Sequence, residues 1–201
     1  LYHNEGNGVF ARAPLDALQT DPGNSHALAW GDYDGDGWLD LVVGNYGGAL
    51  ALYHNQGDGT FRRVTTGIVP LVVANVLSAS WVDYDGDGDL DLFVVTDTGQ
   101  NDVLLRNDAD GWFTVAPPSS INTDAANGGG HVWADFDNDG DLDLFVARWG
   151  QANAYHRNNG DGTFTAVTQG PWAGVAGFAV GVMAGDFDND GDLDLVVANA
   201  N

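Results

Sequence analysis

The chain of 201 residues contains no cysteine, which excludes a disulfide framework, a thiolate metal site and a cysteine nucleophile. It also contains no lysine, and six arginines stand against 28 aspartates and one glutamate, so the formal net charge is −23. A charge of this sign and size repels phosphate backbones and anionic lipid headgroups. We therefore expect no nucleic acid among the partners of this protein.

Long apolar runs are absent as well. Residues 170–185 carry no charge, but this stretch has 16 residues and begins with Gly-Pro, whereas a membrane-spanning helix needs roughly 20 apolar residues. We interpret the stretch as a buried strand with its connection, and we expect no membrane span.

Aspartate, in contrast, is abundant and concentrated in four similar loops: DYDGDGWLD from Asp32, DYDGDGDLD from Asp83, and DFDNDGDLD from both Asp135 and Asp186. Nineteen of the 28 aspartates lie in these loops. Each loop has carboxylates at positions 1, 3, 5 and 9 and a glycine at position 6, which permits the sharp turn that aims the carboxylates at one point. Such clustered oxygen donors predict about four Ca²⁺ ions, one per loop. Mg²⁺ is disfavoured because it demands tight octahedral geometry.

The loops start 51, 52 and 51 residues apart, and a second motif has the same spacing: NEGNGVF from Asn4, NQGDGTF from Asn55, NDADGWF from Asn107 and NNGDGTF from Asn158. The distance from the phenylalanine of this motif to the next loop is constant. The single inserted residue must therefore lie between Asp91 and Asn107.

Each repeat is predicted to contain four short strands: one before the loop, a β-branched run after it, and the two arms of the Asp-Gly hairpin. No segment shows sustained helical spacing of apolar residues. An all-β unit of four antiparallel strands and about 51 residues is typical of a β-propeller blade. We predict a single β-propeller domain over residues 1–201, with blades centred on the loops at 32–40, 83–91, 135–143 and 186–194.

The pairing of the aspartate loop with a following NxGDGTF hairpin resembles the FG-GAP/VCBS repeat of integrin-α-type propellers, and the resemblance covers essentially the whole chain. It implies calcium held by the side chains at loop positions 1, 3, 5 and 9 and by the backbone carbonyl at position 7. The side-chain ligands implied here are Asp32, Asp34, Asp36 and Asp40; Asp83, Asp85, Asp87 and Asp91; Asp135, Asp137, Asp139 and Asp143; and Asp186, Asp188, Asp190 and Asp194. The implied carbonyl ligands belong to Trp38, Asp89, Asp141 and Asp192. The chain departs from the family in blade number, since most members resemble larger rings.

An EF-hand is the rival explanation for a D-x-D-x-D-G loop, but it needs a bidentate glutamate at position 12 and a helix on each side. Position 12 is a valine inside a β-branched run in every copy: Val43, Val94, Val146 and Val197. The sequence excludes an EF-hand.

Aromatic residues recur at fixed places around the loops, as packing between blades requires. Three tryptophans lie two residues before a loop, and an aromatic residue is the second residue of every loop; these are Trp30, Trp81, Trp133, Tyr33, Tyr84, Phe136 and Phe187. We predict that all of them belong to the core.

The sequence starts within one repeat and stops after the second strand of another, so the fourth blade is divided between the two ends. We favour closure within one molecule, in which residues 1–13 complete the blade that begins near Val180. Pairing of the half-blades between molecules, and a chain that is a section of a longer repeat protein, are the alternatives.

Histidine is the obvious catalytic candidate, but His3 and His54 share one repeat position and His156 lies within one residue of it, which favours a structural role. No Ser-His-Asp arrangement or phosphate-binding loop can be assembled, and we expect no enzyme.

On the face opposite the calcium loops, Tyr46 and Trp149 share one repeat position, and we single them out as candidate ligand-binding residues for a glycan or a protein.

We expect a secreted or surface-displayed calcium-binding β-propeller that serves as a binding, adhesion or assembly module. Sites in extracellular modules bind calcium at about 0.1 to 1 mM, a concentration found outside cells. The alternatives are a structural subunit of a surface fibre, which self-assembles through the divided blade, and the scaffold of a polysaccharide-cleaving enzyme.

Overall fold

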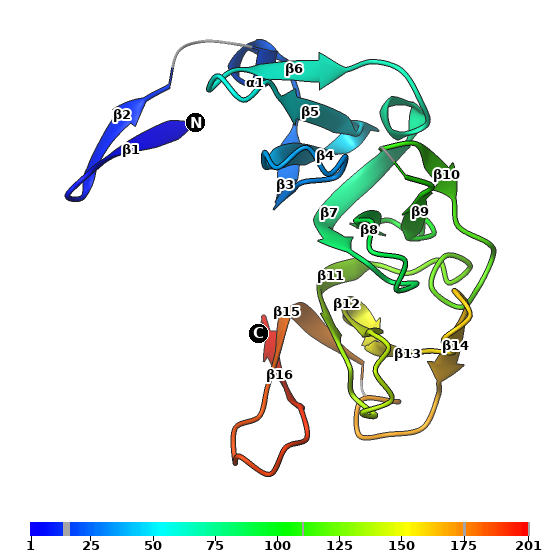
Figure 1. Ribbon diagram of the computed structural model, residues 1–201. Coiled ribbons are helices and arrows are strands. Elements are labelled where there is room, and N and C mark those ends of the chain that lie inside the picture. The colour runs from blue at the N-terminus through cyan, green and yellow to red at the C-terminus, as the bar shows by residue number, and fades with distance from the viewer. Residues whose placement is uncertain (14–16, 110, 175, 201) are drawn as a thin grey trace.

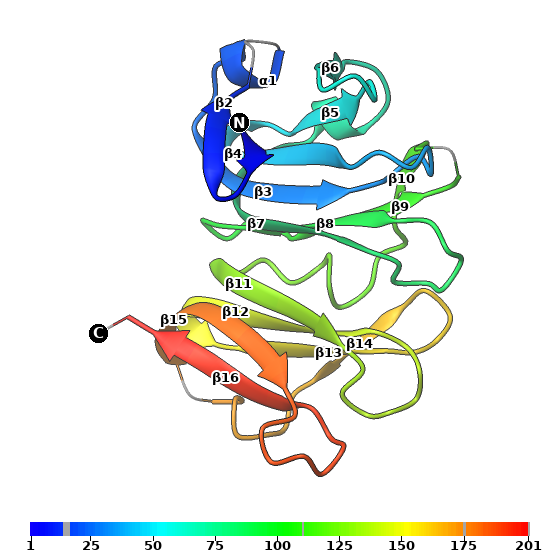
Figure 2. The ribbon, with the colours of Figure 1, turned by 60° about the vertical axis from the view of Figure 1, so that its left-hand side comes forward.

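The computed structural model describes residues 1–13, 17–109, 111–174 and 176–200. The described residues form small antiparallel sheets arranged side by side along an open arc (Figures 1 and 2). The sheets have the strand order of propeller blades, which confirms the predicted fold class.

Three blades are complete, and in each the four strands pair in the order of the sequence. Blade A consists of β3 (Ser25–Gly31), β4 (Asp40–Ala49), β5 (Ala51–Asn55) and β6 (Phe61–Val64). Blade B consists of β7 (Val73–Val82), β8 (Asp91–Thr96), β9 (Val103–Asn107) and β10 (Phe113–Val115). Blade C consists of β11 (Gly128–Ala134), β12 (Asp143–Ala152), β13 (Ala154–Asn158) and β14 (Phe164–Val167).

Two further strand pairs flank these blades. The strands β15 (Ala176–Gly185) and β16 (Asp194–Asn199) form the first half of a fourth blade, blade D, and β1 (Tyr2–Gly6) and β2 (Val9–Arg12) form a hairpin. One short helix, α1 (Ala17–Thr20), and one 3-10 turn, η1 (Val69–Leu71), lie in connections. No helix of the described ranges is long and apolar enough to cross a membrane.

The aspartate loop fixes the register of the first two strands in every blade. The residue before each loop pairs with the last aspartate of that loop: Gly31 with Asp40, Val82 with Asp91, Ala134 with Asp143 and Gly185 with Asp194. Because the same register recurs, each loop emerges from the same end of its blade.

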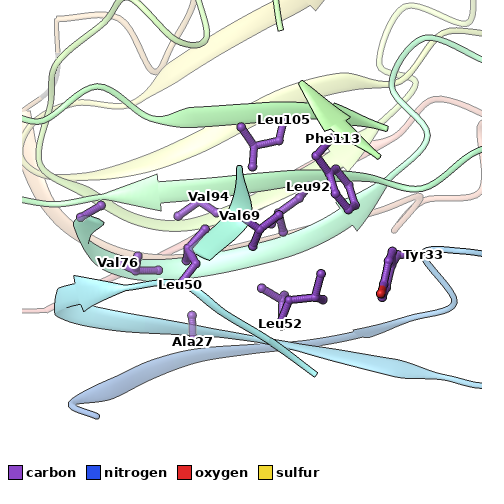
Figure 3. Packing of buried hydrophobic residues seen from close by; sticks show 12 residues of the cluster. Ala27, Tyr33, Leu50, Leu52, Val69, Val76, Leu92, Val94, Leu105 and Phe113 are labelled. Atoms are coloured by element: carbon purple, nitrogen blue, oxygen red, sulfur yellow. The ribbon is translucent and has the colours of Figure 1, made fainter. Parts of the chain in front are cut away.

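The core lies between blades. The second strand of each complete blade begins with a run of buried apolar residues, because both of its faces are covered. In blade A one face packs on blade B, and the other is covered by Ala17 and Leu18. Between blades A and B, Leu52, Val76 and Leu92 pack together, and the rings of Tyr33 and Phe113 face each other at the end near the loop (Figure 3). A second cluster built around Phe93 and Leu144 joins blades B and C.

Small residues permit the close approach of blades at two places. A Cβ atom added to Gly44 of blade A would overlap the side chain of Val76 in blade B, and one added to Gly128 of blade C would overlap Val95. Backbone pairing also links blades, since the far end of β4 pairs with β7 and the far end of β12 pairs with β15. The relative rotation of successive blades is therefore fixed by packing and by hydrogen bonds.

The extra residue of the second repeat lies in the connection between β8 and β9, within the predicted interval. This connection turns at Thr98 and Gly99, both of which have positive φ. Asp102 closes it, because its Oδ1 accepts a hydrogen bond from the Thr96 backbone N–H at 2.8 Å.

Of the aromatic residues predicted to be core, those between blades are confirmed and those at the ends of the arc are not. Trp81 packs between blades A and B and donates a hydrogen bond from Nε1 to the Ala29 carbonyl at 3.1 Å. Trp30 is 46% exposed and Phe187 is 78% exposed. Each of these two lies on a blade face that no neighbouring blade covers among the described residues, so their assignment to the core was wrong.

The expected closure of the ring within one molecule is also not what the structure has. Hairpin β1–β2 forms a two-stranded sheet by itself, and within the described ranges β16 pairs only with β15. The hairpin and blade D lie at opposite ends of the arc (Figure 1). The packed interfaces fix the angle between successive blades, and this angle leaves the two ends apart.

Asp102 supplies a pH-dependent contribution to stability. Burial raises its pKa to about 7, although the Thr96 N–H and nearby Arg148 oppose the shift. A folded-state pKa above the unfolded value of about 3.9 means that the protonated carboxyl stabilises the fold at low pH, and that this contribution is lost as the pH rises towards 7. The loss between pH 5 and 8 amounts to about 3 kcal/mol at most.

We expect Asp102→Asn to be less sensitive to this rise in pH, since the amide oxygen still accepts the Thr96 hydrogen bond without a charge. Thermal unfolding followed by circular dichroism in saturating calcium, at pH 5, 6, 7 and 8, tests this. The melting temperature of the wild type should fall relative to that of the variant by several degrees over this range. Parallel pH profiles would contradict the prediction.

Candidate functional site

The first aspartate of each loop organises the turn through backbone hydrogen bonds. Asp32 accepts from the Asp36 N–H at 3.0 Å through Oδ1 and from the Gly37 N–H at 2.9 Å through Oδ2. The same two bonds recur at Asp83, Asp135 and Asp186 with lengths of 3.0 to 3.1 Å. This side chain folds the loop back on itself and lies close to the position-3 carboxylate in every loop.

The last aspartate of each complete blade is fully buried and joins the loop to the hairpin. Asp91 accepts from the Tyr84 N–H at 3.1 Å through Oδ2 and from the Asn107 N–H at 2.8 Å through Oδ1. Asp40 and Asp143 make the equivalent bonds. The position-9 carboxylate therefore depends on the repeated asparagine as well as on its own loop.

Each loop brings three carboxylates into a group whose oxygen atoms lie within 4.8 Å of one another. The groups are Asp32, Asp34 and Asp36; Asp83, Asp85 and Asp91; Asp135, Asp137 and Asp139; and Asp186, Asp188 and Asp194. Asp40 forms a further group with Asp34 and His54. The remaining implied side-chain ligands, Asp87, Asp143 and Asp190, lie in the same loops but outside these groups.

Position 7, whose carbonyl the family resemblance implies as a ligand, is held by the position-5 side chain. The backbone N–H of Trp38 donates to Asp36 Oδ1 at 2.8 Å, and Asp89, Asp141 and Asp192 make the same bond. The side chains at position 7 take no part in the carboxylate groups.

The donor sets fit a hard divalent cation. Burial, and then the neighbouring position-5 carboxylate, raise the pKa of both Asp34 and Asp85. The Oδ1 atom of each is buried and accepts no hydrogen bond from the described part of the chain. Burial likewise raises the pKa of Asp91 to about 7. Carboxylate oxygens that are buried, mutually repelling and unsatisfied are what a Ca²⁺ ion, which takes six to eight oxygen ligands, would neutralise.

The loops are also coupled to the packing of blades. Asn107 of blade B donates from Nδ2 to the Tyr33 carbonyl in the loop of blade A at 2.7 Å, and Asn158 of blade C donates to the Tyr84 carbonyl in the loop of blade B at 2.8 Å. The rings of Phe113 and Tyr33 are 5.8 Å apart across the same interface. A change in the conformation of one loop therefore disturbs its contacts with the next blade.

One buried and one partly buried histidine have serine partners. His131 Nε2 lies 2.7 Å from Ser80 Oγ, and His156 Nδ1 lies 2.9 Å from Ser120 Oγ. Burial lowers the pKa of each histidine to about 4. A neutral imidazole bonded to a hydroxyl in the interior matches the structural role expected for His156, and His131 has the same arrangement.

The opposite face carries a second set of functional groups, at the ends of the strands away from the loops. A cavity of about 470 Å³ lies between β7, β11 and β15, and its lining includes Trp149 and Asp97. Trp149 is 45% exposed, and its ring packs on Phe178 at a centroid distance of 4.9 Å. Tyr46 does not line this cavity, but its hydroxyl donates to Asp97 Oδ2 at 3.0 Å.

Asp97 is a residue that the sequence reasoning missed. Tyr46, Asp97 and Trp149 each lie fourteen residues after the first aspartate of their loops, at 32, 83 and 135. A comparison of this repeat position in all three blades would have identified Asp97, because it is the blade B equivalent of Tyr46 in blade A and Trp149 in blade C.

Comparison with solved structures shows the same fold. A lectin from Agrocybe aegerita, described by its specific recognition of non-reducing terminal N-acetylglucosamine, superposes with a TM-score of 0.63 over 98% of this chain and 53% of its own, at 23% identity. BBS1N, solved in complex with ARL6DN, superposes with a TM-score of 0.56 over 89% of this chain and 51% of its own, at 15% identity. At these identities the likeness concerns the fold alone.

Among curated proteins, the chain is similar to Cartilage acidic protein 1. The human and mouse proteins are each 30% identical to it over 160 residues. The match covers 73% of this chain but only 24% of those relatives, so the chain spans about a quarter of their length.

A family model, the FG-GAP-like repeat, matches the chain four times, at residues 1–43, 32–94, 83–146 and 135–197. The first match contains hairpin β1–β2 and the loop at 32–40. Each of the other three begins at one aspartate loop and ends just after the next, so the matches follow the 51-residue period of the blades. Since the four matches together span nearly every residue, the chain belongs to the FG-GAP-like repeat family.

Proposed function

We propose that this chain is a calcium-stabilised section of an extracellular β-propeller that binds a glycan on the face opposite its calcium loops. The repeat loops serve stability, because their carboxylates are coupled to the interfaces between blades. The cavity beside Trp149 and Asp97 serves recognition. The family, and the extracellular character that the name of the cartilage relative suggests, support this assignment.

The single observation that carries the proposal is the pairing of a half-exposed tryptophan with a carboxylate at one cavity. The flat face of an indole stacks on the apolar face of a sugar ring, while a carboxylate accepts hydrogen bonds from sugar hydroxyls. Asp97 is oriented by the Tyr46 hydroxyl. The recognition of N-acetylglucosamine described for the similar lectin propeller supports the same class of ligand. A protein ligand on this face is the alternative outcome.

A glycan array probed with the labelled, calcium-loaded protein tests the proposal, followed by titration calorimetry on the best glycan. We expect Trp149→Ala to weaken that glycan by at least about 30-fold, the effect of losing a contact worth about 2 kcal/mol. Trp112→Ala is the matched control, since Trp112 is also exposed but lies in a hairpin at the loop end of blade B. Asp97→Asn should weaken binding as well.

Unfolding temperatures in calcium establish that each variant is folded. The proposal fails if no glycan on the array binds, or if Trp149→Ala and Trp112→Ala bind equally well. Binding of a protein without any glycan would assign the face to the alternative ligand.

A further inference from the structure

The loop of blade A differs from the other two complete blades in the side chain that faces it. The residue before the repeated asparagine is His54 in blade A, but Arg106 in blade B and Arg157 in blade C. The hairpin β1–β2 carries His3 at the same repeat position. An imidazole nitrogen is a metal ligand, whereas a guanidinium has no lone pair to offer.

His54 lies among the carboxylates of its loop. Its Nδ1 is 3.1 Å from Asp34 Oδ2 and 3.3 Å from Asp40 Oδ1, and its Nε2 is 3.8 Å from Asp36 Oδ2. One ligand atom each from Asp34, Asp40 and His54 fall within 4.8 Å of one another. The loop of blade A therefore offers a mixed nitrogen and oxygen donor set.

The ring is held in this place by its surroundings. β5 pairs with β6 so that His54 is opposite Arg62, and the next residue, Asn55, donates its backbone N–H to Asp40 at 2.8 Å. The ring of Tyr33 meets the imidazole edge-on at 6.5 Å. The side chain of His54 is 17% exposed. The ligand set is thus largely preformed.

The short distances between the His54 ring and the carboxylates leave some polar atoms without hydrogen bonds. His54 Nδ1 and Asp34 Oδ1 are both buried, and neither has a hydrogen-bond partner among the described residues. His54 Nδ1 nevertheless lies 3.1 Å from the other oxygen of the same carboxylate, Asp34 Oδ2. Such an arrangement costs free energy unless something is bound between them.

The chemistry of the donors separates this loop from the others. Calcium takes oxygen ligands, whereas imidazole suits zinc and neighbouring transition metals. We propose that the loop of blade A binds Zn²⁺ or a similar transition-metal ion through Asp34, Asp40 and His54, in preference to calcium, while the loops of blades B and C bind calcium. The inference rests on the proposed role of the repeat loops as cation sites.

Titration of Zn²⁺ into the calcium-saturated protein by calorimetry is the test. We expect one zinc ion to bind per chain, and we expect His54→Arg, which installs the residue found in blades B and C, to weaken zinc at least about 100-fold. The long-range ¹⁵N–¹H spectrum should show a zinc-induced shift of the His54 imidazole nitrogen. His3→Arg is the matched control and should change nothing, since His3 is exposed and belongs to no carboxylate group among the described residues. Arg106→His should create a second zinc site in blade B.

Failure of the zinc site can be distinguished from failure of the proposed calcium sites. Suppose that the protein binds both calcium and zinc. If His54→Arg leaves zinc binding unchanged, or if His3→Arg abolishes it, the zinc site is wrong, and the proposed calcium role of the loops is unaffected. If the wild type binds no calcium at any loop, the proposed role of the repeat loops fails first. If His54→Arg alters calcium binding but zinc never binds, His54 acts only as a positive partner of the carboxylates, and the inference is wrong.

Discussion

Removal of divalent cations with EGTA at pH 7.5 is expected to lower the melting temperature of this protein by about 10 to 28 °C. Extracellular modules bind calcium with dissociation constants near 0.1 mM. At about 2 mM calcium, each such site adds about 1.8 kcal/mol to the free energy of unfolding. Three or four occupied loops therefore add about 5 to 7 kcal/mol, and each kcal/mol corresponds to about 2 to 4 °C in a chain of this size.

The size of this effect follows from the charge that the loops concentrate. The net charge is −23, and 19 aspartates lie in the four loops. Two unit charges about 4 Å apart repel by about 4 kcal/mol at an effective dielectric constant of 20. Without a cation the loops must open or take up protons, and opening disturbs the bonds from Asn107 and Asn158 to the preceding blades.

Differential scanning calorimetry with and without EGTA measures the effect. Calcium should restore the melting temperature and magnesium at equal concentration should do so only weakly, because magnesium keeps its waters and needs octahedral geometry. Added sodium chloride is the control for general screening of the acidic surface. A melting temperature that EGTA leaves unchanged would show that the loops are ordinary polar turns.

Asp91→Ala is expected to lower the free energy of unfolding by about 3 to 5 kcal/mol. The carboxylate is fully buried and accepts two backbone hydrogen bonds, from Tyr84 and Asn107. Truncation leaves both donors without a partner, and hydrogen bonds to charged groups contribute about 1.5 to 3 kcal/mol each. In calcium the loss also includes one ligand, so the effect should be larger than in EGTA.

Asp194→Ala is the matched control, because Asp194 occupies the same loop position in blade D. Among the described residues it accepts one backbone bond, from the Phe187 N–H at 3.1 Å, and has no counterpart of the Asn107 bond. This bond is exposed, so water can replace the lost carboxylate, and we expect a cost of about 1 kcal/mol or less in EGTA. Urea unfolding of both variants measures the difference. Equal losses for the two variants would contradict the view that position 9 stabilises the fold by joining a loop to its hairpin.

The repeat made much of this protein predictable. The 51-residue period and the alternating patterns predict the four strands per unit, the hairpins, the place of the inserted residue and the all-β class. These are local properties, and the same sequence pattern for them recurs in every repeat. The grouping of Asp32, Asp34 and Asp36 in one loop was equally accessible, because a nine-residue loop cannot place them far apart.

Other features depended on which blade stands beside which. Trp30 and Trp81 are equivalent in the sequence, yet one is half-exposed and the other packed, since a neighbouring blade covers only Trp81. The separation of hairpin β1–β2 from blade D, and the meeting of His54 with the carboxylates of its loop, were likewise beyond a reading of single repeats.

The sequence by itself determined the blade, because hydrogen bonding within a blade and the turn of an aspartate loop are decided by residues close along the chain. Only the tertiary structure decided the open arc, the cavity beside Trp149 and the bond from Tyr46 to Asp97. These features join residues from different blades, and the rotation between blades is set by the packing of side chains such as Tyr33 against Phe113, which no local pattern encodes.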